Sequence, residues 1–239
     1  MSLAPGSLSG AVVAFDLDGT LVDTAPDLVG ALNSVLHEQG LPPLAFGAAR
    51  VMVGRGARAL IEQGFSAAGA PLDAAHAPQL VERFIAVYLD RIARESRPFE
   101  GVEAALDQLA DAGAILAVCT NKRTDLSLAL LDALGLTARF AAVIGADQAP
   151  APKPDPRHLL TAIAAAGGVA TRAVMVGDSA SDVGAARAAG VPSLVVSFGY
   201  TQIPADELGA DLVMDRFDAV CGAVARLLGA GASADLAQS

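Results

Sequence analysis

Two aspartates one residue apart, Asp16 and Asp18, end an apolar run in the stretch VVAFDLDGTLVDT (12–24). The run Val12 to Phe15 has the character of a strand covered on both faces, as in a parallel sheet between helices. Because side chains alternate along a strand, both carboxylates would point to the same side if the extended geometry continues. Like charges about 6–7 Å apart repel by about 2–3 kcal/mol at an effective dielectric constant near 20. We therefore expect a cation, or a proton held on one carboxyl group, to offset the repulsion, unless the pair only ends the strand in a turn at Gly19.

Other polar residues follow apolar runs later in the chain. Thr120 and Asn121 come directly after one run, and Asp178 and Asp182 lie in the stretch GDSASD after another. Lys153 stands between prolines in APKPDP, a stiff loop between two such runs. In open α/β sheets, ligands bind beyond the carboxyl ends of the strands. Each residue alone would be an ordinary turn or surface residue, but their order predicts one site at that edge of a sheet.

Apolar runs alternate with helical patterns from residue 101 onward, which predicts the elements that position these residues. We expect strands at 114–119, 141–146, 173–177, 192–198 and 211–214, and helices at 101–113, 124–135, 155–168, 181–190, 204–209 and 216–229. Thr124 is the expected N-cap of its helix, and Gly135 the expected stop. The end of the chain after 229 is expected to fray. This alternation is typical of the α/β class with a doubly wound, mostly parallel sheet.

The segment between the first and second strands is too long for a simple connection. A parallel crossover needs about a dozen residues, whereas roughly 90 separate Asp23 from the strand at 114. Only helical patterns occur in this segment, from Pro26 to about Gln39, after 54–56, and over 80–95. We therefore predict a helical domain at 24–97 inserted into an α/β domain made of 1–23 and 98–239.

Composition limits the partners of this chain. Of its 239 residues 53% are hydrophobic, yet no uninterrupted apolar run reaches the length of a transmembrane helix. The first ten residues lack the features of a signal peptide, which favours a cytoplasmic location. A formal net charge of −10 argues against nucleic acid or an anionic membrane as a partner. The cysteines Cys119 and Cys221 show no zinc or disulfide pattern, and we expect Cys119 to be a small buried apolar residue. The three histidines show no ligand spacing, and we treat them as structural or exposed.

The quoted motifs resemble those of the haloacid dehalogenase superfamily, and within it the phosphoglycolate phosphatase group. The matching stretches are DLDGT (16–20), TN (120–121), Lys153 and GDSASD (177–182), in the order of that family. The resemblance covers nearly the whole chain. It implies that the first strand is central in the sheet and that the insertion at 24–97 is a helical cap.

The resemblance also implies a division of roles among the acidic residues. Asp16 would be the nucleophile that forms an aspartyl-phosphate, and Asp18 the acid that protonates the leaving alcohol and then activates water. Mg²⁺ would be the cofactor, held by Asp16, the backbone carbonyl of Asp18, and Asp178. Asp182 would not bind the metal itself but would orient the metal ligands or Lys153.

Substrate contacts follow from the same resemblance. Thr120 and the backbone at Asn121 would bind phosphate oxygens, and Lys153 would stabilise the charge that develops on them. The expected partner is a small phosphorylated metabolite such as 2-phosphoglycolate. Its carboxylate would meet Arg55, which lies between two glycines, or Arg58, because arginine binds carboxylates bidentately.

Several alternatives stay open at this point. The same residues would serve a phosphomutase of the β-phosphoglucomutase type, or a phosphatase for another small phosphoester. A dehalogenase would have no use for Asp18 and the GDSASD cluster, and a non-catalytic binding domain should have lost one of the catalytic groups. The sequence does not distinguish a monomer from a homodimer, or Mg²⁺ from Mn²⁺.

Overall fold

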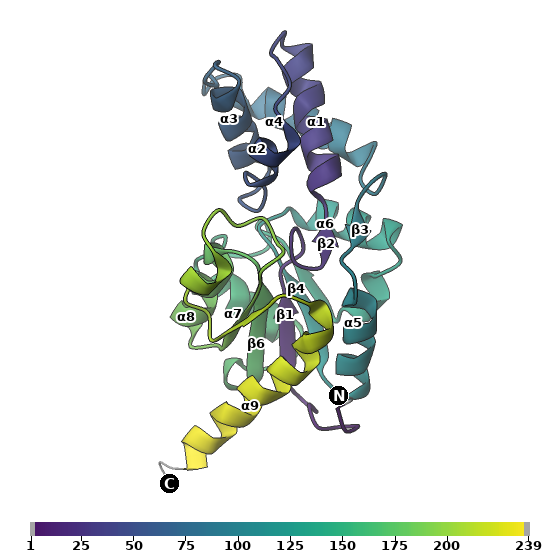
Figure 1. Cartoon of the computed structure of the whole chain (residues 1–239), viewed down its shortest axis with the longest axis vertical. Helices are drawn as coiled ribbons and strands as arrows, with labels where there is room; N and C mark the ends of the chain where they lie inside the picture. The colour runs from purple at the N-terminus through teal and green to yellow at the C-terminus, as the bar shows by residue number, and fades with distance from the viewer. Residues whose placement is uncertain (1–2, 237–239) are drawn as a thin grey trace.

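A six-stranded parallel sheet forms the centre of the computed structural model, which describes residues 3–236 (Figure 1). The strand order is β5-β4-β1-β6-β7-β8, so that the first strand lies in the interior, as the resemblance implies. The bounds are β1 Val12–Phe15, β4 Ile115–Cys119, β5 Ala142–Ile144, β6 Ala173–Gly177, β7 Ser193–Val196 and β8 Leu212–Met214.

Helices cover both faces of this sheet, which confirms the doubly wound α/β class. Along β1, the side chains of Val12 and Ala14 pack toward α7 and α8, and those of Val13 and Phe15 toward α5 and α9; all four residues are fully buried. The helices of this part are α5 Val102–Asp111, α6 Thr124–Ala133, α7 Pro156–Ala165, α8 Ala180–Ala189 and α9 Val220–Leu236. Short 3-10 turns span Thr137–Arg139, Ala170–Arg172, Ala205–Glu207 and Phe217–Ala219.

The segment between β1 and α5 is mostly helical and packs around an apolar core of its own. Its helices are α1 Ala25–Glu38, α2 Phe46–Arg50, α3 Ala57–Ala67 and α4 Ala77–Leu89. They lie together at one end of the molecule, while both chain termini lie at the opposite end (Figure 1). Leu126 of α6 and Tyr200, which follows β7, are the two buried residues from outside the segment that join its core.

Two short strands connect this helical segment to the sheet. Strands β2 (Val22–Asp23) and β3 (Arg97–Pro98) pair antiparallel, so that the chain enters and leaves the segment side by side. This pairing was not predicted, because two residues are too few for a periodic pattern. The division into 1–23 with 98–239 and 24–97 stays a prediction, which the paired strands favour.

Local details differ from the expectations at several points. The prediction of Thr124 as an N-cap is wrong: α6 begins at Thr124, and the Asp147 carboxylate accepts a hydrogen bond from its backbone N at 2.7 Å. Helix α9 runs beyond 229 to Leu236, where the end of the chain was expected to fray. Helix α2 was missed, and α4 both begins and ends earlier than the predicted 80–95.

Among the described residues, no helix has the length and apolar character needed to span a membrane.

Candidate active site

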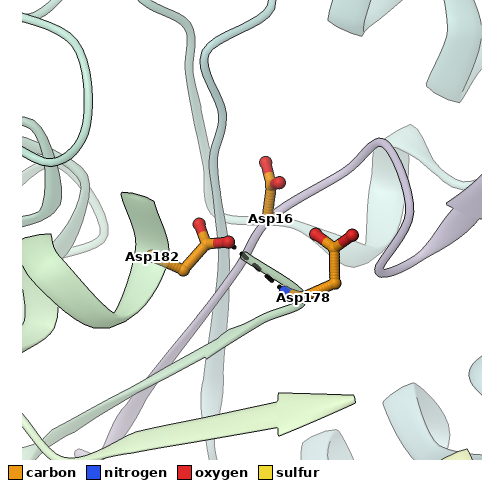
Figure 2. A group of neighbouring side chains, drawn as sticks. All are labelled: Asp16, Asp178 and Asp182. Carbon is orange, nitrogen blue, oxygen red and sulfur yellow. Dashed lines mark hydrogen bonds between the residues drawn. The ribbon is translucent and has the colours of Figure 1, made fainter. Parts of the chain in front are cut away.

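Three buried carboxylates gather beyond the carboxyl ends of two neighbouring strands. Asp16 directly follows β1, Asp178 directly follows β6, and Asp182 lies in the first turn of α8 (Figure 2). One oxygen from each lies within 4.8 Å of the others, and no residue of the three is more than 4% exposed. Parallel pairing of β1 with β6 matches Phe15 with Val176, which places the following aspartates at the same edge.

Lys153 enters this cluster from the proline-containing loop before α7. Its Nζ donates to Asp182 Oδ1 at 2.6 Å and to the Cys119 carbonyl oxygen at 2.6 Å. It also lies 2.9 Å from Asp16 Oδ1 as an ion pair. Burial would lower the pKa of Lys153, but the carboxylates of Asp16 and Asp182 outweigh it and raise the pKa, so the ammonium stays charged.

Asp182 uses both of its oxygens on protein donors. Oδ2 accepts from the backbone N and the hydroxyl of Ser179 and from the backbone N of Asp178, the contact drawn in Figure 2. Ser179 and Asp182 form a capping box at the start of α8, a common way to satisfy free N–H groups at a helix start. Since Oδ1 is bound by Lys153, Asp182 is placed to hold its neighbours rather than to receive a ligand.

Asp16 and Asp178 have too few positive neighbours to offset the cost of burying their negative charge. Burial raises the pKa of Asp16 to about 6, while Lys153 acts in the opposite direction. Burial, Asp182 and Asp16 raise the pKa of Asp178 well above its ordinary value. Apart from its ion-pair contact with Lys153, the buried Asp16 Oδ1 has no hydrogen-bond partner among the described residues. A carboxylate set with an unsatisfied oxygen fits a hard divalent cation, which prefers oxygen ligands.

The Asp178 side chain is held by groups that arrive from two other segments. Thr20 Oγ1 donates to Asp178 Oδ1 at 3.2 Å, and the backbone N of Tyr200 donates to Oδ2 at 2.7 Å. The Tyr200 hydroxyl donates to Asp23 Oδ1 at 2.6 Å and accepts from the backbone N of Ala25 at 2.9 Å. Asp23 therefore links the entrance of the helical segment to the acidic cluster through Tyr200.

The side chains of Thr120 and Asn121 lie at the same sheet edge. Thr120 is buried after β4 and accepts a hydrogen bond from the backbone N of Lys122. The Asn121 side chain accepts from the backbone N of Lys153 and donates to its carbonyl oxygen. Asn121 thus fixes the Lys153 loop, and its backbone stays the predicted phosphate contact.

Two residues that sequence reasoning left without a function also belong to this region. His158 is fully buried, and its Nδ1 accepts from the backbone N of Lys153 at 3.2 Å, so it holds the same loop. In the sequence, the one indication of this role was that His158 lies five residues after Lys153. Lys122 Nζ lies 3.1 and 3.2 Å from the two oxygens of Asp18. In the sequence, the only indication of a role for Lys122 was its position next to Asn121.

A cavity of about 250 Å³ lies between the helical segment and the sheet, next to Asp18. Leu28, Leu60 and Phe84 contribute apolar walls, and Lys122 and Arg55 contribute positive charge. Arg55 is exposed, while Arg58 is exposed and pairs with Glu62 at 2.8 Å. The structure thus brings Asp16, Lys153, Asp178 and Asp182 together, and Arg55 lines both this cavity and a second one of about 320 Å³ that reaches Asp178.

Fold and site define a class of α/β protein with a lysine-supported acidic cluster beneath a helical segment. Residues 13–196 match the sequence model of the haloacid dehalogenase-like hydrolases, and the chain belongs to that family.

Relatives with assigned names extend this comparison. The chain is 65% identical over 210 residues to a phosphoglycolate phosphatase of Caulobacter vibrioides, which covers 88% of this chain and 89% of the relative. It is 47% identical over 221 residues to a phosphoglycolate phosphatase of Agrobacterium fabrum, covering 92% and 95%. A solved structure of a predicted phosphoglycolate phosphatase from Haemophilus somnus superposes with a TM-score of 0.83 at 28% identity, covering 90% of this chain and 98% of that one.

Proposed function

We propose that this protein is a phosphomonoester hydrolase that converts 2-phosphoglycolate and water to glycolate and inorganic phosphate. The observation that carries the proposal is the buried Asp16 carboxylate at the end of β1, which shares one site with Asp178, Asp182 and the charged Lys153. A carboxylate is a nucleophile of the kind that forms a covalent phosphoryl intermediate. The choice of substrate rests on the names of the relatives that cover most of this chain.

We further propose Mg²⁺ as the cofactor, with Asp16, the backbone carbonyl of Asp18, and Asp178 as protein ligands. The all-oxygen donor set and the raised pKa of Asp16 and of Asp178 support a hard cation here. When bound, the ion would neutralise phosphate charge and keep these carboxylates ionised. Asp182 would hold Lys153 and the backbone of Asp178 in place, as its hydrogen bonds indicate.

The residues of the chain would act in two steps. In the first, an Asp16 oxygen attacks phosphorus, the ester P–O bond breaks, and the leaving oxygen takes a proton from Asp18. In the second, Asp18 takes a proton from water, whose oxygen attacks the aspartyl-phosphate and releases phosphate and the Asp16 carboxylate. Thr120, the backbone at Asn121, and Lys153 would hold the phosphate oxygens during both steps.

The helical segment 24–97 would serve as a cap that excludes water around the intermediate and reopens for product release. A cytoplasmic location, and a monomeric or homodimeric state, remain predictions from the sequence. The expected partner is a small phosphorylated metabolite.

The first test is phosphate release from 2-phosphoglycolate and a panel of sugar phosphates, with Mg²⁺ and with EDTA. We expect release that requires Mg²⁺, is fastest for 2-phosphoglycolate, and drops by at least a thousandfold in Asp16→Asn, because the nucleophile is lost. A folded Asp16→Asn with activity near that of the wild type would contradict the assigned nucleophile. Preference for another phosphoester would overturn the substrate, and isomer formation without phosphate release would indicate a mutase.

A further inference from the structure

Lys122 is a buried cation that the proposed reaction does not yet use. It lies after Asn121 with 7% of its surface exposed, and its Nζ contacts both oxygens of Asp18. On another side, the same Nζ lies 4.4 Å from the centre of the Tyr88 ring, a cation–π contact between sheet edge and helix α4. Lys122 thus sits where the helical segment meets the residue proposed as general acid.

Tyr88 adds an unsatisfied polar group at the same place. It lies near the end of α4, is 0% exposed, and lines the cavity beside Asp18. Its hydroxyl donates no hydrogen bond among the described residues, and the Lys122 ammonium is its charged neighbour. A buried hydroxyl that donates no hydrogen bond costs about 1–3 kcal/mol, so its presence indicates a group that a ligand satisfies.

The proposed chemistry requires the Lys122–Asp18 contact to change. Asp18 must come within hydrogen-bond distance of the ester oxygen that leaves, about 2.6–3.2 Å. In 2-phosphoglycolate, the carbon that bears this oxygen is bonded directly to the carboxyl carbon. A group in contact with both oxygens of Asp18 is therefore next to the position of the substrate carboxylate.

We propose that Lys122 and Tyr88 form the subsite for the carboxylate of the phosphorylated acid, with Lys122 exchanging its partner from Asp18 to the substrate on binding. This inference rests on the proposed function and specifies how the site selects an acid. Lys122 supplies the compensating charge, and the Tyr88 hydroxyl donates the hydrogen bond that it lacks in the free protein. A phosphoester without a carboxylate leaves Lys122 bound to Asp18.

The arginines near the cavity are less well placed for this role. Arg58 is paired with Glu62, and Arg123 binds Asp125 with two hydrogen bonds of 3.1 and 2.7 Å. Arg55 lines the cavity but is exposed, so that solvent weakens its attraction for a carboxylate. Lys122, by contrast, is buried, where a charge–charge contact is weakened little by solvent.

The test compares 2-phosphoglycolate with 2-hydroxyethyl phosphate, which carries a hydroxymethyl group in place of the carboxylate. The measured quantity is the ratio of kcat/KM values for the two substrates, in the wild type and in Lys122→Met, Tyr88→Phe, Arg55→Met and Arg83→Met. Arg83 is the matched control, since it lies on the same helix as Tyr88, pairs with Glu38 and does not line the cavity. Urea unfolding of each variant establishes that it is folded.

We expect Lys122→Met to lower this ratio about 10- to 100-fold and Tyr88→Phe about 3- to 10-fold, as for lost hydrogen bonds to a charged group. Arg83→Met should keep the wild-type ratio. Equal losses for both substrates in Lys122→Met, with an unchanged ratio in Tyr88→Phe, would overturn the subsite and leave Lys122 only a support for Asp18. A reduced ratio in Arg55→Met alone would also overturn it. A wild type without preference for 2-phosphoglycolate would instead contradict the proposed substrate.

Discussion

At the scale of single residues, Lys153 and Lys122 divide the aspartates of the site between them. Lys153 contacts Asp16 and Asp182, and Lys122 contacts Asp18. The two aspartates one residue apart thus have different cationic neighbours. Different surroundings for two carboxylates are the usual way in which one becomes a nucleophile and the other an acid. The repulsion expected from their spacing is offset only in part by the two lysines, because the pKa of Asp16 is still raised to about 6.

Gly19 allows the chain to turn between Asp18 and Thr20, and its substitution is a test at this scale. Its φ is +86°, and a Cβ there would come within 2.5 Å of Asp178 Oδ2 and 2.8 Å of Tyr200 Cδ2. We expect Gly19→Ala to lower the free energy of unfolding by about 1–2 kcal/mol through its backbone. It should also weaken Mg²⁺ binding, because the new methyl group displaces Asp178. Urea unfolding and Mg²⁺ titration by calorimetry measure the two effects.

Gly40→Ala is the matched control for this prediction. Gly40 has a similar φ of +72°, but a Cβ there meets nothing within 4 Å. This variant should lose a similar amount of stability and keep the wild-type Mg²⁺ affinity. If both variants bound Mg²⁺ like the wild type, the contact between Gly19 and Asp178 would not matter for the metal.

At the scale of elements, Asp27 joins the start of α1 to the chain that leaves α4. Its Oδ2 accepts from the backbone N of Glu95 at 2.9 Å and from the backbone N and hydroxyl of Ser96 at 2.8 and 2.7 Å. Arg91 donates to Oδ1 at 3.2 Å. Burial alone would raise the pKa of Asp27, but these hydrogen bonds outweigh it and hold the pKa below its ordinary value.

Asp27→Asn should therefore destabilise the protein in a pH-dependent way. At pH 7 we expect a loss of about 1–3 kcal/mol, as for hydrogen bonds to a charged group. Because the folded pKa is the lower one, the stabilisation is complete above the unfolded value of about 3.9 and is lost as pH falls through the folded value. The difference between wild type and variant should therefore shrink below about pH 4. Urea midpoints at pH 7, 5 and 3 measure it.

An exposed aspartate in the same region serves as the control. Asp90 directly follows α4 and is exposed, so Asp90→Asn should change the urea midpoint little at any of these pH values. If the urea midpoints of the wild type and Asp27→Asn differed by the same amount at pH 7 and at pH 3, the ionised carboxylate would not be the source of the stabilisation.

At the scale of the whole molecule, an acidic protein must bind an anionic substrate. The formal charge of −10 repels anions at a distance, so local cations have to provide the attraction. Burial would lower the pKa of Lys122, but Asp18 outweighs it and raises the pKa, so that Lys122, like Lys153, stays charged. Both lysines reach the junction of sheet and helical segment, where the substrate is expected to bind.

Metal binding should be visible in the stability of the whole chain. Mg²⁺ at a hundred times its dissociation constant adds about 2.7 kcal/mol to the free energy of unfolding if it binds only the folded chain. For a chain of this size, that corresponds to a rise of about 5–10 °C in Tm. Thermal unfolding with Mg²⁺ and with EDTA measures the shift, and Asp178→Asn should abolish most of it. An equal shift in this variant would place the binding elsewhere.

The sequence by itself determined the α/β class, the carboxyl ends of the strands that form the site, and the residues that gather there. These follow from local patterns: apolar runs mark β1, β4 and β6, and Asp16, Thr120 and Asp178 come directly after them. Parallel pairing then leaves these residues little freedom except to meet at one edge of the sheet. The interior position of β1 and the assigned roles came from the family resemblance, not from the patterns.

Only the tertiary structure decided which partners these residues have. Asp147 caps α6 across 23 positions, Tyr200 joins Asp23 across 177, and Lys122 pairs with Asp18 across 104. Such contacts leave no periodic signal, because they depend on how loops far apart in the sequence meet at the edge of the sheet. The unsatisfied hydroxyl of Tyr88 has the same origin: burial beside Lys122 is a property of the packed molecule, and a tyrosine in the pattern of α4 is otherwise an ordinary core residue.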